Sequence, residues 1–121
     1  MLLLWTISAL LALVTATTTQ DSWQSDMFLQ GTVKSSSPPI QYWRSGFSVN
    51  HDGDIIIFSP GAGLDHHLFD AQVLPLLLAG YRVVTYDPRC QGLSQVSNLT
   101  ARASCTITFD LMLNDMVSMM R

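Results

Sequence analysis

The chain has 121 residues, of which 48% are hydrophobic and 12% are charged, so it is long enough for one domain and too apolar for an intrinsically disordered protein. Six basic residues stand against nine acidic ones, and the net charge is −3. Since the sequence contains no basic run, nucleic acid is not an expected partner.

Residues 1–16 form the first distinct segment, which is apolar from Leu2 to Val14. This run is shorter than the roughly 20 residues of a membrane-spanning helix. Val14 and Ala16 place small residues where a signal peptidase cuts, so we predict a cleaved signal peptide and a secreted protein. No Lys or Arg precedes the run, and two alternatives therefore stay open: an uncleaved membrane anchor, or a mis-assigned start and a cytoplasmic protein.

After the signal segment we expect a polar tail over residues 17–26 and one partial domain over residues 27–121. Two strands are predicted at its start, over residues 27–34 and 40–44. The connection between them is Ser-Ser-Ser-Pro-Pro. Because proline fixes φ and cannot donate to a strand ladder, this connection favours a turn, and the two strands form a hairpin.

Residues 54–59 and 82–87 contain the continuous apolar runs IIIF and VVTY, which are typical of strands covered on both faces. Residues 70–80 between them predict a helix that ends at Gly80 in the left-handed conformation. Its apolar side carries Leu74, Leu76, Leu77 and Leu78. Strand, helix and strand with short connections predict a parallel βαβ unit and an α/β sheet.

The last expected element is an amphipathic helix over residues 108–121, capped by Thr106 or Thr108. Its apolar face follows a 3.6-residue spacing and comprises Phe109, Met112, Leu113, Met116, Val117 and Met120. We expect the polar residues elsewhere on the helix: Asp110, Asn114, Asp115, Ser118 and Arg121. The methionine stripe is interpreted as ordinary core.

A candidate site follows from the position of two glycine-containing segments, residues 59–64 and 87–94. Both follow predicted parallel strands, and ligands of open α/β sheets bind beyond the carboxyl ends of the strands. A first interpretation is dinucleotide binding, because Gly61 and Gly63 begin a G-x-G-x-x-G pattern. His66 stands where the third glycine belongs, and no cofactor is therefore expected.

A second interpretation is a metal site, since four ligand-type residues follow the first loop: Asp65, His66, His67 and Asp70. Adjacent histidines point in different directions on a strand or a helix. We therefore expect surface groups at the start of the helix, and no metal. A third interpretation is an oxyanion loop, in which backbone N–H groups about 3 Å from a developing oxyanion stabilise acyl transfer by several kcal/mol.

The stretch IIIFSPGAGLDHHLFDAQV, followed by LLLAGYRVVTYDPRCQGLSQ, resembles the N-terminal part of the α/β-hydrolase superfamily, of the AB hydrolase-1 type. The resemblance extends from about Phe28 to Arg121. It implies the N-terminal half of that fold: an antiparallel hairpin leading into a parallel βαβ unit, then an amphipathic helix, in an incomplete sheet. By position it makes Gly61 the loop glycine and Ala62 the oxyanion-hole donor, with Gly63 as a second candidate.

The resemblance also covers the second loop, whose Asp-x-Arg-Gly-x-Gly-x-Ser motif is matched by Asp87, Arg89, Gly92 and Ser94. In the family this segment is largely a structural turn. Two positions depart from the family pattern. Pro60 replaces a histidine, and Cys90 replaces a glycine. A positive φ at the glycine position would strain Cys90 by about 1–2 kcal/mol.

The family's nucleophile lies in a G-x-S-x-G elbow, followed by an acid and a histidine. Residues 46–50 and 92–96 each miss the last glycine, and His51, His66 and His67 come too early in the chain. We therefore expect an inactive N-terminal fragment of a hydrolase that acts on a small ester- or amide-like substrate. The alternative is a secreted, non-catalytic binding protein derived from a hydrolase, so whether this chain is an enzyme is left open.

Three further expectations follow. Strand 54–59 would have one unpaired edge, which permits self-association or aggregation. Cys90 and Cys105 either stay as two thiols or form a disulfide, worth about 3 kcal/mol in the chain-entropy model. Asn98 begins the sequence Asn-Leu-Thr, which is an N-glycosylation sequon.

Overall fold

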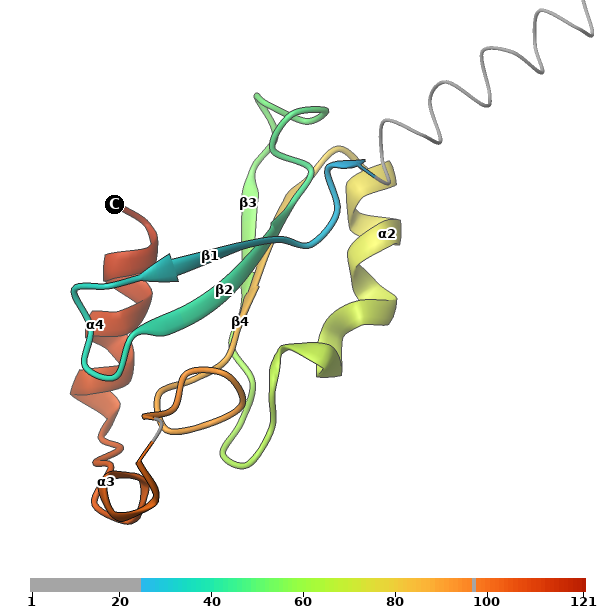
Figure 1. The fold of residues 1–121 in the computed structure, drawn as a ribbon. Helices are drawn as coiled ribbons and strands as arrows, with labels where there is room; N and C mark the ends of the chain where they lie inside the picture. Colours follow the sequence, from blue (N-terminus) through green and yellow to red (C-terminus); the bar gives the residue numbers. More distant parts are fainter. Residues whose placement is uncertain (1–24, 97) are drawn as a thin grey trace, which may run out of the picture.

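The computed structural model describes residues 25–96 and 98–121, which form a four-stranded mixed sheet with a helix on each face (Figure 1). The expected signal segment and most of the expected polar tail lie outside the described residues. Among the described helices, none has the length and apolar character needed to cross a membrane.

The N-terminal hairpin is present, as predicted. Strands β1 (Leu29–Val33) and β2 (Ile40–Ser45) pair antiparallel, with Val33 opposite Ile40 next to the turn. The first strand is shorter than expected, because Phe28 has a φ of +55° and interrupts the extended backbone just before it.

Asp26 ties the start of the described chain to the domain. The sequence places this residue in the polar tail, but its side chain is buried. Its Oδ2 accepts the N–H groups of Ser48 and Val49, at 2.7 and 3.2 Å, and its carbonyl oxygen accepts the N–H of Gly46 at 3.1 Å. Asp26 therefore belongs to the folded domain and not to a loose tail.

The βαβ unit supplies the other two strands. Strands β3 (Ile55–Phe58) and β4 (Arg82–Tyr86) pair parallel, and β4 also pairs antiparallel with β2. The resulting strand order is β1-β2-β4-β3, so the expectation of an α/β sheet is confirmed. β4 is central, whereas β3 forms an edge on which Ile55 is 47% exposed.

Helix α2 (Asp70–Leu78) covers one face of the sheet, where Val73 and Leu77 pack against Val83. The helix ends as predicted, because Gly80 has a φ of +93°. The expected leucine side is buried only in part, and Leu74 and Leu78 remain exposed. A helix lying on a sheet buries one stripe, and these two side chains lie outside that stripe.

Helix α4 (Phe109–Met119) covers the opposite face. Successive strand residues point to opposite faces. Val83 packs against α2, whereas the next residue, Val84, lines a groove with Met119 and Met120. Thr108 caps the helix by accepting the N–H of Leu111 at 3.3 Å.

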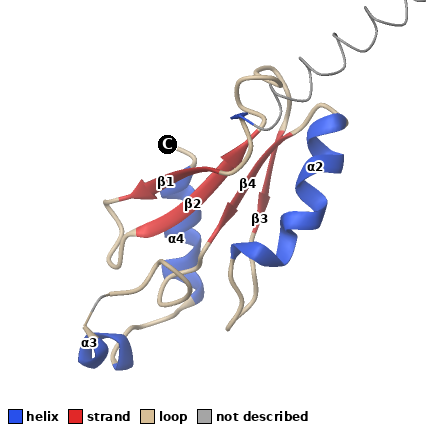
Figure 2. Ribbon diagram, turned by 45° about the vertical axis from the view of Figure 1, so that its right-hand side comes forward, coloured by secondary structure: helices blue, strands red, loops and turns tan. Residues whose placement is uncertain are grey.

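The prediction of which residues form the buried face of this helix is wrong in part. Phe109 is 81% exposed, whereas Asp115, predicted to lie away from the core, is 2% exposed. The reason is a buried ion pair with Arg89, described below. The short helix α3 (Leu99–Ala103) was not predicted, since five residues are too few to show periodicity. Figure 2 shows it away from the sheet.

Candidate functional site

The connections that follow β3 and β4 leave the same end of the sheet and lie side by side, as Figure 1 shows. Hydrogen bonds link the two regions. The hydroxyl groups of Ser59 and Tyr86 are 2.7 Å apart, and the N–H of Gly63 donates to Oε1 of Gln91 at 2.6 Å. Burial raises the pKa of Tyr86 above its usual value. The two predicted segments are thus brought together.

The connection after β3 is an exposed turn. The N–H of Leu64 donates to the carbonyl of Gly61 at 3.2 Å, and Gly63 has a φ of +80°, as the third residue of a type II turn requires. Pro60, just before the turn, is buried. Within the described part of the chain, the N–H groups of Gly61 and Ala62 have no acceptor. Of the two candidate donors, Ala62 N–H is therefore available and Gly63 N–H is occupied.

The connection after β4 is organised by the buried carboxylate of Asp87. Its Oδ1 accepts the backbone N–H of His66 at 2.9 Å and lies 2.7 Å from Nδ1 of the same residue. Its Oδ2 accepts the N–H of Leu93 at 2.7 Å. Gly92 has a φ of +50°, and a Cβ at this position would overlap the Asp87 carboxylate. The motif therefore needs glycine here for space as well as for backbone conformation.

The two adjacent histidines differ. His66 begins the 3₁₀ helix η1 (His66–Phe69), is 7% exposed and stacks on Trp43, with 3.4 Å between ring centroids. The expectation of a surface group is wrong for His66, because Asp87 draws it inward. His67 is exposed, and a hydrogen bond from its Nδ1 to the Asp70 carboxylate raises its pKa above the ordinary value. In residues 25–96 and 98–121, no cluster of three or more ligand-type side chains could hold a metal ion.

The rest of the 87–94 turn is fixed at both ends. Cys90 has a φ of +67°, so the positive φ considered for this position is present, and it forms a disulfide with Cys105. Its N–H donates to the carbonyl of Ser94 at 2.9 Å. Ser94 is buried, and its hydroxyl accepts the N–H of Gln41 from β2 at 2.8 Å.

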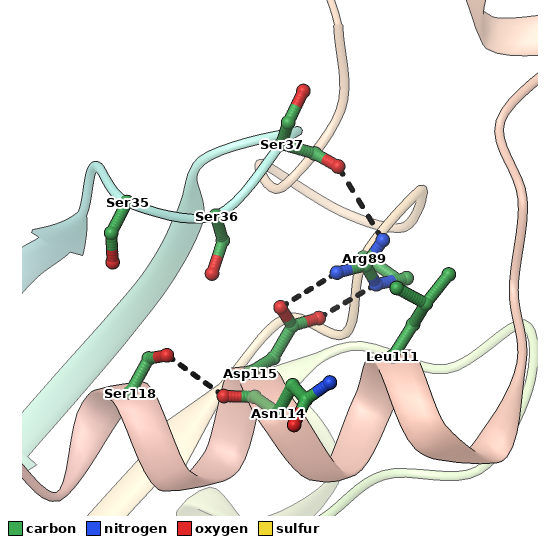
Figure 3. A pocket seen from close by; sticks show the side chains of 8 residues that line it. All are labelled: Ser35, Ser36, Ser37, Arg89, Leu111, Asn114, Asp115 and Ser118. Atoms are coloured by element: carbon green, nitrogen blue, oxygen red, sulfur yellow. Dashed lines mark hydrogen bonds and ion pairs between the residues drawn. The ribbon is translucent and has the colours of Figure 1, made fainter.

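Arg89 joins this turn to α4. Its Nε and Nη2 donate to both oxygens of Asp115, at 2.8 and 2.7 Å, and its Nη1 donates to the carbonyl of Ser37 at 3.4 Å (Figure 3). The pair borders an open pocket of about 290 Å³. The other lining residues are Ser35, Ser36, Ser37, Leu111, Asn114 and Ser118. Because both charges are matched, we interpret the pair as a structural clamp.

Comparison with known proteins gives one relevant likeness. No family model matches the sequence, and no curated protein matches it. Among solved structures, the chain is similar to Rv0554 from Mycobacterium tuberculosis, with 24% sequence identity and a TM-score of 0.51. The match covers 77% of this chain but only 30% of the Rv0554 chain. The likeness supports the mixed α/β fold.

Proposed function

We propose that the chain forms the N-terminal half of an α/β-hydrolase-type catalytic domain, in which the turn after β3 supplies an oxyanion donor. The observation that carries this proposal is the N–H of Ala62, which lies in an exposed turn and has no acceptor among the described residues. A donor fixed where negative charge develops stabilises the transition state of acyl transfer. Gly61 has no side chain, so it does not block the approach of a substrate to this N–H.

The reaction that we propose for the longer protein, of which this chain would be the N-terminal half, is hydrolysis of a small ester- or amide-like substrate by a serine nucleophile. The nucleophile, acid and base would lie on elements that continue the sheet beyond β3, whose outer edge is unpaired among the described strands. Alone, the chain would be inactive, because an oxyanion donor without a nucleophile stabilises an intermediate that never forms.

The test compares the chain alone with the chain extended by the sequence encoded downstream of Arg121. We expect the chain alone to hydrolyse p-nitrophenyl acetate at the buffer rate. We expect the extended protein to contain a G-x-S-x-G elbow and to show turnover that a fluorophosphonate inhibits. Inhibitor-sensitive turnover by the chain alone would overturn the proposal of an inactive half-domain.

Ala62→Pro tests the oxyanion donor in the extended protein. Ala62 occupies the second position of the turn, which proline favours, so the substitution removes the N–H while preserving the turn. We expect kcat to fall about 10²–10³-fold. Ala62→Gly keeps the N–H and serves as the matched control. Equal activities of the two variants would exclude Ala62 as the donor.

A second candidate function is a non-catalytic interaction module. It is favoured by the unpaired edge of β3 and by an adjacent apolar groove of about 290 Å³, since an edge strand can accept a strand from a partner. The groove is lined by apolar side chains: Phe47, Ile55, Ile57, Val84, Met119 and Met120. Cooperative unfolding of a monomer, seen by light scattering and calorimetry, would favour this function. Aggregation through β3 would favour the half-domain.

Export from the cytoplasm is part of the proposal. It is supported by the Cys90–Cys105 disulfide, since disulfides persist in oxidising compartments, and by the exposure of Asn98 in its sequon. Expression in a eukaryotic host should give a glycosidase-sensitive mass shift that Asn98→Gln abolishes and Thr100→Ser retains. An unglycosylated cytosolic chain that keeps Met1 would contradict export.

A further inference from the structure

We infer that Gln91 is a positioning residue for the turn after β3: its side chain takes the N–H of Gly63 and thereby assigns the donor role to Ala62. This inference rests on the proposed function, because it specifies which amide of the turn faces the reacting oxygen. Gln91 is not one of the four residues in the second loop that match the family motif.

The contact itself is short and specific. The N–H of Gly63 donates to Oε1 of Gln91 at 2.6 Å, across 28 residues of sequence. An amide oxygen is the same kind of acceptor as the carbonyl oxygen of an ester or amide substrate. A single N–H cannot serve both acceptors at full strength, so the Gly63 amide is withdrawn from the site while Gln91 holds it.

Gln91 can hold the turn because its own backbone is fixed. Its N–H donates to the carbonyl of Pro88 at 3.0 Å, and its carbonyl accepts the N–H of Ser94 at 2.9 Å. The preceding residue, Cys90, is held by the disulfide. Ser94 is buried, and its hydroxyl accepts the N–H of Gln41 in β2. The side chain of Gln91 therefore projects from a well-fixed turn toward an exposed one.

The turn after β3 has little else to fix it. Residues 61–64 are all exposed, and a Cβ on Gly63 would meet nothing within 4 Å. Type I and type II turns differ by a flip of the peptide between their two central residues, here Ala62 and Gly63. The hydrogen bond to Gln91 fixes the N–H direction of that peptide. Without it, the Ala62 carbonyl is free to swing toward the site and oppose an oxyanion.

Amide hydrogen exchange in the full chain tests this inference without requiring catalysis. We expect Gln91→Ala to accelerate exchange of the Gly63 amide about fivefold, the size expected for loss of one hydrogen bond. Exchange of the His66 and Leu93 amides, which Asp87 protects, should be unchanged. Gln91→Glu keeps an acceptor oxygen and should preserve protection of Gly63.

Gln95→Ala is the matched control. Gln95 belongs to the same connection and also makes one side-chain hydrogen bond, from Nε2 to the carbonyl of Gly92 at 2.7 Å, but it does not contact the turn after β3. Unchanged Gly63 exchange in Gln91→Ala, or equal acceleration in Gln95→Ala, would overturn the inference. Failure of Ala62→Pro to reduce turnover would refute the proposed function instead, leaving the exchange result independent.

Discussion

The connections after β3 and β4 leave the same end of the sheet, but their polar groups differ in burial and in hydrogen bonding. After β4, Asp87, Arg89 and Ser94 are buried, and each has a partner distant in sequence. After β3, residues 61–64 are exposed, and two N–H groups have no acceptor in the described part of the chain. The contrast teaches that the loop after β4 is held by buried polar contacts, whereas the loop after β3 keeps backbone N–H groups free, as the proposed function requires.

The largest loss of stability is expected when the ion pair between Arg89 and Asp115 is broken. Asp115→Ala leaves the Arg89 guanidinium buried without its partner, and we expect the free energy of unfolding to fall by about 3–5 kcal/mol. Asp110→Ala is the control on the same helix. Its carboxylate is exposed in the first turn, so its loss should cost no more than about 1 kcal/mol. Denaturant unfolding measures both, and similar costs would remove the distinction between buried and exposed polar groups.

The two loop glycines give a direct comparison of intermediate size. Gly92→Ala adds a methyl group against the Asp87 carboxylate at positive φ, and should cost about 3 kcal/mol from overpacking and backbone strain together. Gly63→Ala meets open space at positive φ, and should cost only about 1 kcal/mol. Thermal unfolding of the two variants gives the difference. A larger loss for Gly63→Ala would show that the turn after β3 is the more tightly packed one.

The smallest expected effect concerns His67, the exposed neighbour of His66. Its hydrogen bond with Asp70 raises its pKa above 6.5 in the folded state, so the pair stabilises the fold fully below pH 6.5 and loses this contribution as the pH rises through the raised value. Asp70→Asn should bring the pKa back toward 6.5, with little change in stability because both groups are exposed. An NMR titration of the imidazole proton measures the shift, and an unchanged midpoint would show that Asp70 does not set it.

Local sequence signals were sufficient for most of the fold. The apolar runs of β3 and β4 and the glycine that ends α2 are each read within a few residues, and they placed the two loops at the same end of the sheet. The burial of Asp115 and His66 could not be predicted in this way. Their partners, Arg89 and Asp87, lie 26 and 21 residues away, and only the folded chain brings such groups together.

The candidate site was predictable to the same extent. Glycine at the carboxyl end of a strand indicated the turn after β3, and the resemblance singled out Ala62 and Gly63 together. The difference between these two amides depends on which way one peptide points, and that direction is set by a side chain from the neighbouring loop. Periodicity and composition carry no information on such a contact.

The position of β3 at the outer edge of the sheet also has a consequence during synthesis on the ribosome. β3 precedes its parallel partner β4 in the chain, and among the described strands it pairs with β4 alone. At about 5–20 residues per second, the nascent segment Ile55–Phe58 waits on the order of seconds for β4 to emerge. During this interval its three isoleucines offer a binding sequence to the chaperones that meet the growing polypeptide.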